Sequence, residues 1–216
     1  VDVALGAKFD HASLVGASFT DSRFVAASFR GADMQRAVVQ NTVFDRSVFD
    51  ATTKLAGTDF TGEASFSEAQ MAGVNLDGAL IGGEPGQGPQ LYKANLTGAS
   101  FRGAILSEAK LTEASVHGTD FTGANLHKAD FLKATAVKAV FRQAILTEAN
   151  FNDAVIDGAD FTGARLARAE LLNVCGTPIN LGGGVQYLPA HFCPMLTPAA
   201  GTGVALSGGG AGPSIN

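Results

Sequence analysis

The chain has 216 residues, of which 46% are hydrophobic, with a mean hydropathy of +0.17 and a net charge of −5. It has no stretch close to the ~18 to 20 uncharged apolar residues of a membrane-spanning helix, and its apolar content is too high for a disordered chain. The negative balance excludes a general nucleic-acid-binding protein, because phosphate contacts need surplus Lys and Arg.

A five-residue repeat begins at Ala7, where the segments AKFDH, ASLVG and ASFTD follow one another. The frame slips by one residue at Leu55 and again at Phe66, and it resumes at Leu91 after the segment GGEPGQGPQ. Leu or Phe occupies the third position in 25 of the 32 repeats, and Ala, Ser or Thr occupies the first in 30. Such regularity indicates a repeat architecture.

A period of five fits neither a helix, with a period of ~3.6, nor a simple strand, with a period of ~2. It predicts a chain that turns a corner every five residues, with one large and one small side chain pointing inward. Four sides would close a coil of about 20 residues, and the echo of SFRGAILSEAKL at 100–111 in VFRQAILTEANF at 140–151 would span two coils. Ala136 is too small for its third position, so we expect Phe131 or Phe141 to fill that space. The predicted core ladder contains Phe9, Phe19, Phe29, Phe49, Phe60, Phe101, Phe121, Phe141 and Phe161.

With motifs such as Ala94-Asn95-Leu96 and Ala159-Asp160-Phe161, the sequence resembles the pentapeptide-repeat family, whose motif is A(N/D)Lxx. The resemblance covers residues 7–173. It implies an all-β fold, a right-handed quadrilateral parallel β-helix (a solenoid) of about eight coils. We therefore expect the β-helix to occupy residues 1–173, with a loop or bulge at 82–90.

The chemistry changes after Glu170, because residues 171–216 contain no Asp, Glu, Lys or Arg but 10 Gly and 5 Pro. We expect residues 174–196 to form a short irregular or helical cap over the last coil, with Pro189 starting a helical turn. The Gly-rich tail at 197–216 is predicted either to be flexible or to dock on a partner. The apolar residues predicted for the cap are Tyr187, Leu188, Phe192 and Met195.

Cys175 and Cys193 are the only cysteines, and both lie in the predicted cap. A disulfide between them would stabilise the cap by about 3 kcal/mol and would indicate an oxidising compartment. Two free thiols in a reducing compartment are the alternative. A zinc site at Cys175, His191 and Cys193 is disfavoured, because a fourth ligand is missing and the spacing is unusual.

The sequence contains no constellation typical of an enzyme, and we predict no catalytic, cofactor or metal site. The coil histidines, His11, His117 and His127, occupy outward positions of their repeats, where a solvated role is expected. The glycine clusters lack the strand–loop–helix context of a phosphate loop. A bore filled by Leu, Phe and Ala also leaves no room for a small ligand.

The predicted function is therefore that of a rigid scaffold for protein–protein interaction. The regular coil with a two-cysteine cap is similar to members of the family from the thylakoid lumen. This resemblance implies protein subunits of a photosynthetic, membrane-associated complex such as a photosystem as partners, docked through the faces of the β-helix and the uncharged tail. It implies a location in the thylakoid lumen of a chloroplast or cyanobacterium, or in another oxidising compartment, and the cytoplasm is the alternative.

The alternative function is a DNA mimic that binds and protects DNA gyrase or another topoisomerase, as some family members do. Full mimicry by a rod of about 38 Å would need about 22 net negative charges, because duplex DNA carries one per ~1.7 Å. Residues 1–90 hold 11 acidic and 6 basic residues, and residues 91–173 hold 9 of each. A regulatory binding module with another partner also remains open.

Overall fold

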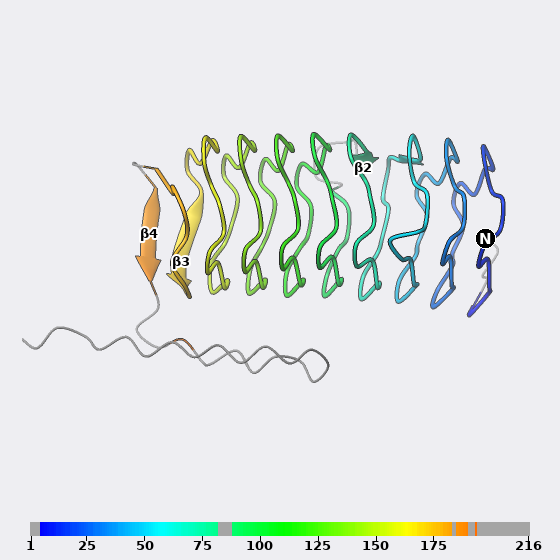
Figure 1. Ribbon diagram of the computed structural model, residues 1–216, viewed down its shortest axis with the longest axis horizontal. Coiled ribbons are helices and arrows are strands. Elements are labelled where there is room, and N and C mark those ends of the chain that lie inside the picture. The colour runs from blue at the N-terminus through cyan, green and yellow to red at the C-terminus, as the bar shows by residue number, and fades with distance from the viewer. Residues whose placement is uncertain (1–4, 82–87, 183–184, 190–192, 194–216) are drawn as a thin grey trace, which may run out of the picture.

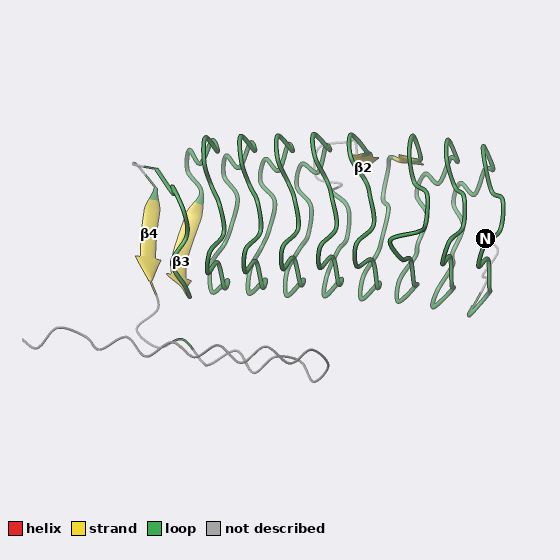
Figure 2. Ribbon diagram, in the orientation of Figure 1, coloured by secondary structure: helices red, strands yellow, loops and turns green. Residues whose placement is uncertain are grey.

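In the computed structural model the chain winds into a long tube, with the N-terminus at one end and β4 at the other (Figure 1). The structure describes residues 5–81, 88–182, 185–189 and 193. Within this part of the chain only four short strands are formed, so most of the tube wall is coloured as loop in Figure 2. The strands are β1 (Asp59–Phe60), β2 (Leu80–Ile81), β3 (Glu170–Val174) and β4 (Gln186–Pro189).

The wall of the tube is held by single parallel bridges between successive coils, most of them joining residues 20 apart, as in Asp120–Val140. Across the described residues these bridges form four ladders, which define the four faces of the tube. Face 1 runs from Lys8 to Cys175, face 2 from Ser13 to Ile179, face 3 from Ser18 to Arg165 and face 4 from Arg23 to Glu170. The prediction of a four-sided parallel β-helix therefore agrees with the backbone pairing.

Each repeat has five positions, illustrated by residues 139–143, where Val140 in position 2 carries the bridge. A corner follows at once, closed by a hydrogen bond from the Ala144 N–H to the Phe141 carbonyl at 3.1 Å. Position 5 adopts the left-handed conformation, with φ of 56° at Gln143 and 63° at Gly118. Glycine tolerates this conformation without Cβ strain, which explains its frequency at position 5.

Positions 1 and 3 point inward and fill the bore. The Phe141 side chain is fully buried. Its ring stacks on Phe121 and Phe161, with centroids 5.2 and 5.0 Å away, and meets Phe131 and Phe151 edge-on at 5.6 and 5.4 Å. The bore therefore holds a continuous aromatic stack with no space for solvent along this stretch.

The predicted core phenylalanines separate into two groups. Phe29, Phe49, Phe60, Phe101, Phe121, Phe141 and Phe161 are buried. Phe9 and Phe19, in the first coil described, pack against the core but remain partly exposed. Ala136 is also buried, and the rings of Phe131 and Phe141, at position 3 of the repeats before and after it, meet edge-on at 5.6 Å.

Three successive coils, measured on face 3, are longer than 20 residues. The bridged residues are 21 apart at Val38–Asp59 and at Asp59–Leu80, and 25 apart at Leu80–Ile105. The longest coil contains residues 82–87, which lie outside the described residues. Gln90 is part of the wall, because it bridges Ser65 and Lys110. Most of the loop or bulge expected at 82–90 falls outside the described residues.

The first extra residue lies between Val48 and Lys54, and hydrogen bonds to the Asp50 carboxylate stabilise the longer corner that it creates. Asp50 accepts hydrogen bonds at Oδ1 from the Thr52 N–H at 3.0 Å and, in the preceding coil, from the Gly31 N–H at 3.2 Å. The Thr52 hydroxyl also donates to this carboxylate and, with these bonds, lowers the pKa of Asp50. The longer corner thus keeps its backbone donors satisfied.

Position 1 holds a hydroxyl in some repeats, and the hydroxyl has a structural role. Each of these buried side chains donates to the position-3 carbonyl of the preceding coil, as Thr119 does to Leu96 at 2.7 Å. The same contact is made by Thr42, Ser47, Thr53 and Thr58. The sequence pattern indicated only that position 1 must be small.

We expect the substitution Thr119→Val to lower the free energy of unfolding by about 1 kcal/mol, because the shape is kept but a buried hydrogen bond is lost. The cost is limited because the Leu96 carbonyl keeps its bond from the Ala99 N–H at 2.9 Å. Thr119→Ser retains the hydroxyl and is the matched control. Urea unfolding of the three proteins tests this, and equal stability of the Val variant and the parent would contradict it.

The C-terminal end of the tube is covered in part by a strand. β4 pairs in parallel with β3, with Glu170 opposite Gln186 and an irregularity between Leu172 and Val174. The expectation of an irregular or helical cap is therefore wrong for Gln186–Pro189, because the open edge of face 4 offers backbone groups that a parallel strand can satisfy. Pro189 is the last residue of β4. The helical turn predicted to start at Pro189 falls on residues 190–192, which lie outside the described residues.

Candidate interaction surface

The outer surface of each face is built from three columns of side chains. Position 4 is the first residue of the corner turn, and its side chain lies on the same side as that of position 2, as the hydrogen bond from the Thr162 hydroxyl to Asp160 shows. Position 5 of the preceding repeat forms the corner column beside them. Because each column repeats once per coil, residues about 20 apart in the sequence become neighbours at ~4.8 Å spacing along the tube.

Face 4 is the charged face, and its two corner columns alternate in sign. At the corner with face 3, the Glu148 carboxylate lies 3.9 Å from Lys128 Nζ and 3.4 Å from an Arg168 terminal nitrogen. At the corner with face 1, Lys93 Nζ lies 3.4 Å from the Glu113 carboxylate. Charges of opposite sign thus neutralise one another coil by coil.

Face 2 carries a polar cluster that occurs twice, two coils apart. Asp160 accepts hydrogen bonds at Oδ1 from the Thr162 hydroxyl and N–H, at 2.5 and 2.9 Å, and at Oδ2 from Arg142 Nε at 2.6 Å. Asp120 is bonded in the same way by Thr122 and Arg102. The Thr162 hydroxyl bond is the main cause that lowers the pKa of Asp160, with further help from the Thr162 N–H and Arg142.

Because the pKa of Asp160 is lower in the folded than in the unfolded state, its ionised form stabilises the fold above the usual carboxyl pKa of ~3.9. We expect this contribution to be lost as the pH falls below about 4. Asp160→Asn should therefore be less stable than the parent at pH 7, and the difference should shrink on acidification. Urea unfolding between pH 7 and pH 3 measures this, and a difference that is independent of pH would contradict the prediction.

Face 3 is uncharged along its middle. Among the described residues, five large hydrophobic side chains are exposed. Three of them lie at the ends of the tube, whereas Leu80 and Ile105, 42% and 45% exposed, are bridged neighbours on face 3. The adjoining corner column contains Gly78, Gly103 and Gly123, which have no side chain, and continues with the exposed Gln143.

The described residues hold no group of three or more His, Cys, Asp or Glu side chains placed to bind a metal ion. His11 and His117 are exposed, and His127 Nδ1 lies 2.7 Å from the Thr147 hydroxyl of the next coil. His191 lies outside the described residues. No helix long and apolar enough to cross a membrane occurs in the part of the chain that is described.

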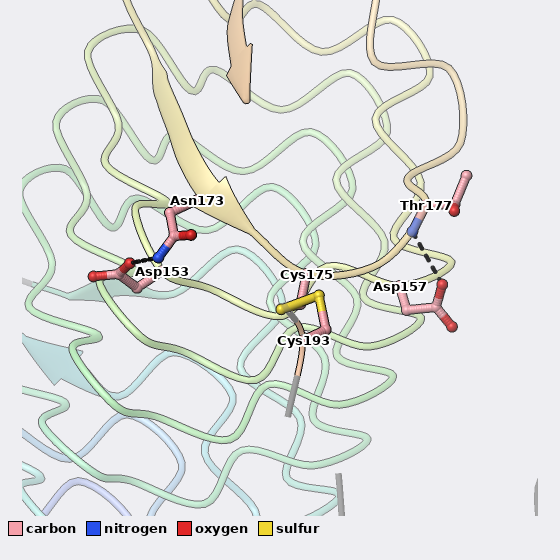
Figure 3. The surroundings of a disulfide bond; sticks show 6 residues. All are labelled: Asp153, Asp157, Asn173, Cys175, Thr177 and Cys193. Carbon is pink, nitrogen blue, oxygen red and sulfur yellow. Dashed lines mark hydrogen bonds between the residues drawn. A yellow bond between two sulfur atoms is a disulfide. The ribbon is translucent and has the colours of Figure 1, made fainter. Parts of the chain in front are cut away.

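The cap is tied to the last coil by a disulfide between Cys175 and Cys193, whose Cα atoms are 5.5 Å apart (Figure 3). Cys175 is half-buried at the end of face 1 and Cys193 is exposed. Beside them, Asn173 donates to Asp153 and the Thr177 N–H donates to Asp157 at 3.0 Å. These bonds fix the chain on either side of Cys175.

The predicted cap residues are only partly placed. Tyr187 and Leu188 lie in β4, opposite Leu171 and Leu172, whereas Phe192 and Met195 lie outside the described residues. Leu181, which carries no repeat signal and was not predicted for the cap, packs against the hydrophobic core together with Val185. The tail at 197–216 lies outside the described residues.

The family model described as pentapeptide repeats matches the chain in eight copies, which cover residues 6–41 and 90–173. No curated protein is significantly similar in sequence. Among solved structures, the chain is similar to HetL, a pentapeptide repeat protein involved in heterocyst differentiation regulation in the cyanobacterium Nostoc sp. strain PCC 7120. The identity is 22% over 79% of this chain and 89% of HetL, with a TM-score of 0.36.

Two further similarities are weaker in shape. Full-length QnrB1, a plasmid-mediated fluoroquinolone resistance protein, is 17% identical over 88% of this chain and 92% of its own, with a TM-score of 0.28. A pentapeptide repeat protein from the Arabidopsis thaliana thylakoid lumen is 25% identical over 49% of this chain and 63% of its own, with a TM-score of 0.22.

Proposed function

Because this chain belongs to the pentapeptide-repeat family, whose members form right-handed β-helices, we propose that it is a non-enzymatic scaffold that binds subunits of a larger protein complex. The observation that carries the proposal is the filled bore. Inward side chains such as Phe141 and Leu146 are fully buried, so other molecules can meet only the outer faces and the ends of the tube.

The wall is suited to such a role because it is rigid. Every coil is hydrogen-bonded to the next on four sides, and the aromatic stack in the bore resists bending. Because the wall is already rigid, the docking of a partner immobilises few additional side chains of this protein, and this limits the entropic cost of binding. The alternating charges of face 4 would then favour a partner with a matching alternation rather than a uniformly charged one.

We place this scaffold in the thylakoid lumen or another oxidising compartment, on the side of a photosynthetic membrane complex. The Cys175–Cys193 disulfide supports an oxidising location, because structural disulfides do not persist in a reducing cytosol. The two-cysteine cap supports the lumen more narrowly, because it is similar to the caps of lumenal family members. Thiol counting by mass spectrometry on protein from its source should find no free thiol, whereas two free thiols would overturn the placement.

The scaffold proposal is tested by capture of partners from a native extract, with the full chain as bait. We expect a defined set of subunits at near-stoichiometric amounts. A variant with Glu148→Lys and Lys128→Glu keeps the net charge but inverts the order of the charges at one corner of face 4. This variant should no longer bind partners that contact this corner. Removal of residues 197–216 tests the separate contribution of the tail. Failure of the full chain to retain any stoichiometric subunit would overturn the proposal.

A DNA mimic is the alternative, and the charge distribution disfavours it. Residues 91–173 carry equal numbers of acidic and basic residues, and pairs such as Arg102–Asp120 at 3.0 Å place both signs on one face. A duplex presents a continuous negative surface instead. We therefore expect the protein at micromolar concentration to leave gyrase supercoiling unchanged, and inhibition or quinolone protection in that assay would favour the mimic.

A further inference from the structure

One step of the wall on face 2 is held more weakly than the steps on either side of it. The bridge between Lys54 and Asn75 rests on weak hydrogen bonds only. In the described part of the chain, the Leu55 N–H has no hydrogen bond of ordinary geometry with the Asn75 carbonyl, and the Asn75 N–H has none with the Thr53 carbonyl. One coil further on, both equivalent bonds of Ser100 are present, at 2.8 and 2.9 Å. We call the step between Lys54 and Asn75 the face-2 seam.

The surface is hollowed at the face-2 seam. An open hollow of about 390 Å³ lies there, with Lys54 and Ala56 on one side of the seam and Asn75 and Asp77 on the other among the residues that line it. In Figure 1, the coil that contains β2 lies farther from the preceding coil along one edge of the tube than along the opposite edge. The two coils at the seam are therefore splayed apart on one side.

The opposite side of the tube is closed at the same level. On face 4, the Phe66 N–H donates to the Gln90 carbonyl at 2.7 Å. On face 1, the Phe49 N–H donates to the Gln70 carbonyl at 2.8 Å. The two coils thus meet as a wedge, which is closed at the corner between faces 4 and 1 and open on face 2.

The wedge has a cause in the sequence. The coil before the seam has an extra residue at two of its corners, because Lys54 follows Val48 by six residues and Ser65 follows Asp59 by six, where five is usual. An extra residue in a bridged segment disrupts the pairing with its neighbour locally. A coil enlarged at two corners cannot match the next coil on all four faces, and the mismatch falls on face 2.

The aromatic stack in the bore is interrupted at the same level. In the N-terminal part of the tube, ring contacts connect Phe9 to Phe66 through the phenylalanines between them. They begin again at Phe101, whose ring stacks on Phe121 with centroids 5.3 Å apart. Between the two stacks, the large buried side chains that the structure describes are Met71, Leu76, Ile81, Leu91 and Leu96. Aliphatic side chains and Met adapt to small displacements more readily than stacked rings do.

We propose that the tube consists of two rigid bodies joined by a hinge at the face-2 seam. The N-terminal body contains residues 5–66, and the C-terminal body contains the described residues of 70–182. Bending opens or closes face 2 and turns about the corner between faces 4 and 1, where the hydrogen bonds are intact. Each body keeps the rigidity of its own bridges and aromatic stack. The proposal concerns the tube alone and stands whether or not the scaffold function does.

Distances between spin labels test the hinge in the full chain with its native disulfide intact. Gln35→Cys with Thr122→Cys places two labels four coils apart on face 2, on opposite sides of the seam. Asp77→Cys with Thr162→Cys is the matched control, because its labels are also four coils apart on face 2 but lie on the same side of the seam. Electron spin resonance should give a distribution of distances at least about twofold wider for the first pair. Equal widths would overturn the proposal, because a rigid wedge has one fixed angle.

A disulfide across the seam tests whether the seam closes. Ala56→Cys with Asp77→Cys places thiols at position 4 of the two coils that flank it, and a disulfide needs Cα atoms ~4.4 to 6.8 Å apart. We expect this bond to form under mild oxidation at least about fivefold more slowly than that of Gln35→Cys with Ala56→Cys, one step earlier, because only the closed form reacts. Failure of the seam pair to oxidise would indicate a fixed gap, and equal rates would indicate a step no wider than its neighbour. Either result would rule out the hinge.

Discussion

Replacement of Phe141 by Ala is expected to lower the free energy of unfolding by about 4 kcal/mol, because it removes a large aromatic side chain from a closely packed bore. The ring is fully buried and contacts four other rings, two stacked and two edge-on. Its removal leaves a cavity that the bore cannot close, because each coil is fixed to its neighbours by hydrogen bonds on four faces. The lost aromatic contacts add to the cost of the cavity.

Urea or thermal unfolding of the full chain measures this effect, and two variants serve as controls. Phe141→Leu should lower the free energy of unfolding by only about 1 to 1.5 kcal/mol. Leu still fills most of the space of the ring, and it is common at position 3. Phe9→Ala should cost clearly less than Phe141→Ala, because Phe9 is partly exposed in the first coil described. Equal losses for Phe9→Ala and Phe141→Ala would contradict the buried-stack interpretation.

Reduction of the Cys175–Cys193 disulfide should destabilise the C-terminal end of the tube by about 3 kcal/mol, the value expected from loop closure over a sequence separation of 18. The bond closes a loop that contains β4, so its loss increases the conformational freedom of the cap in the unfolded state. β4 would then be held to β3 mainly by its short parallel pairing. The described residues of this loop pair with the last coils of the tube, so the middle of the tube should keep its stability.

Hydrogen exchange measured by mass spectrometry, with and without a reducing agent, tests this prediction. We expect Gln186–Pro189 and β3 to lose protection on reduction, while the bridged residues Asn125 and Ile145 remain protected. The double variant Cys175→Ser and Cys193→Ser should behave like the reduced protein without any reducing agent. Unchanged exchange in β4, or uniform loss of protection along the tube, would contradict a local role for the disulfide.

Much of the fold could be predicted from the sequence because the period is strict. A large residue such as Phe121 at position 3 and a small one such as Ala124 at position 1 mark the inside of the wall in nearly every repeat. The hydrogen bond that the Thr119 hydroxyl donates to the Leu96 carbonyl could not be predicted in this way, because Ala, Ser and Thr are all small enough for position 1. The strand β4 could not be predicted either, since Gln186–Pro189 carries no repeat signal.

The sequence by itself determined which side chains point into the tube and which point out, because the five-residue period decides this within each repeat. Only the tertiary structure decided which outward residues share a face and touch. Leu80 meets Ile105 across 25 residues, whereas Asn125 meets Ile145 across 20. The physical reason is that neighbours along a column depend on where each coil closes, and extra residues between repeats lengthen a coil without changing which positions of a repeat point inward.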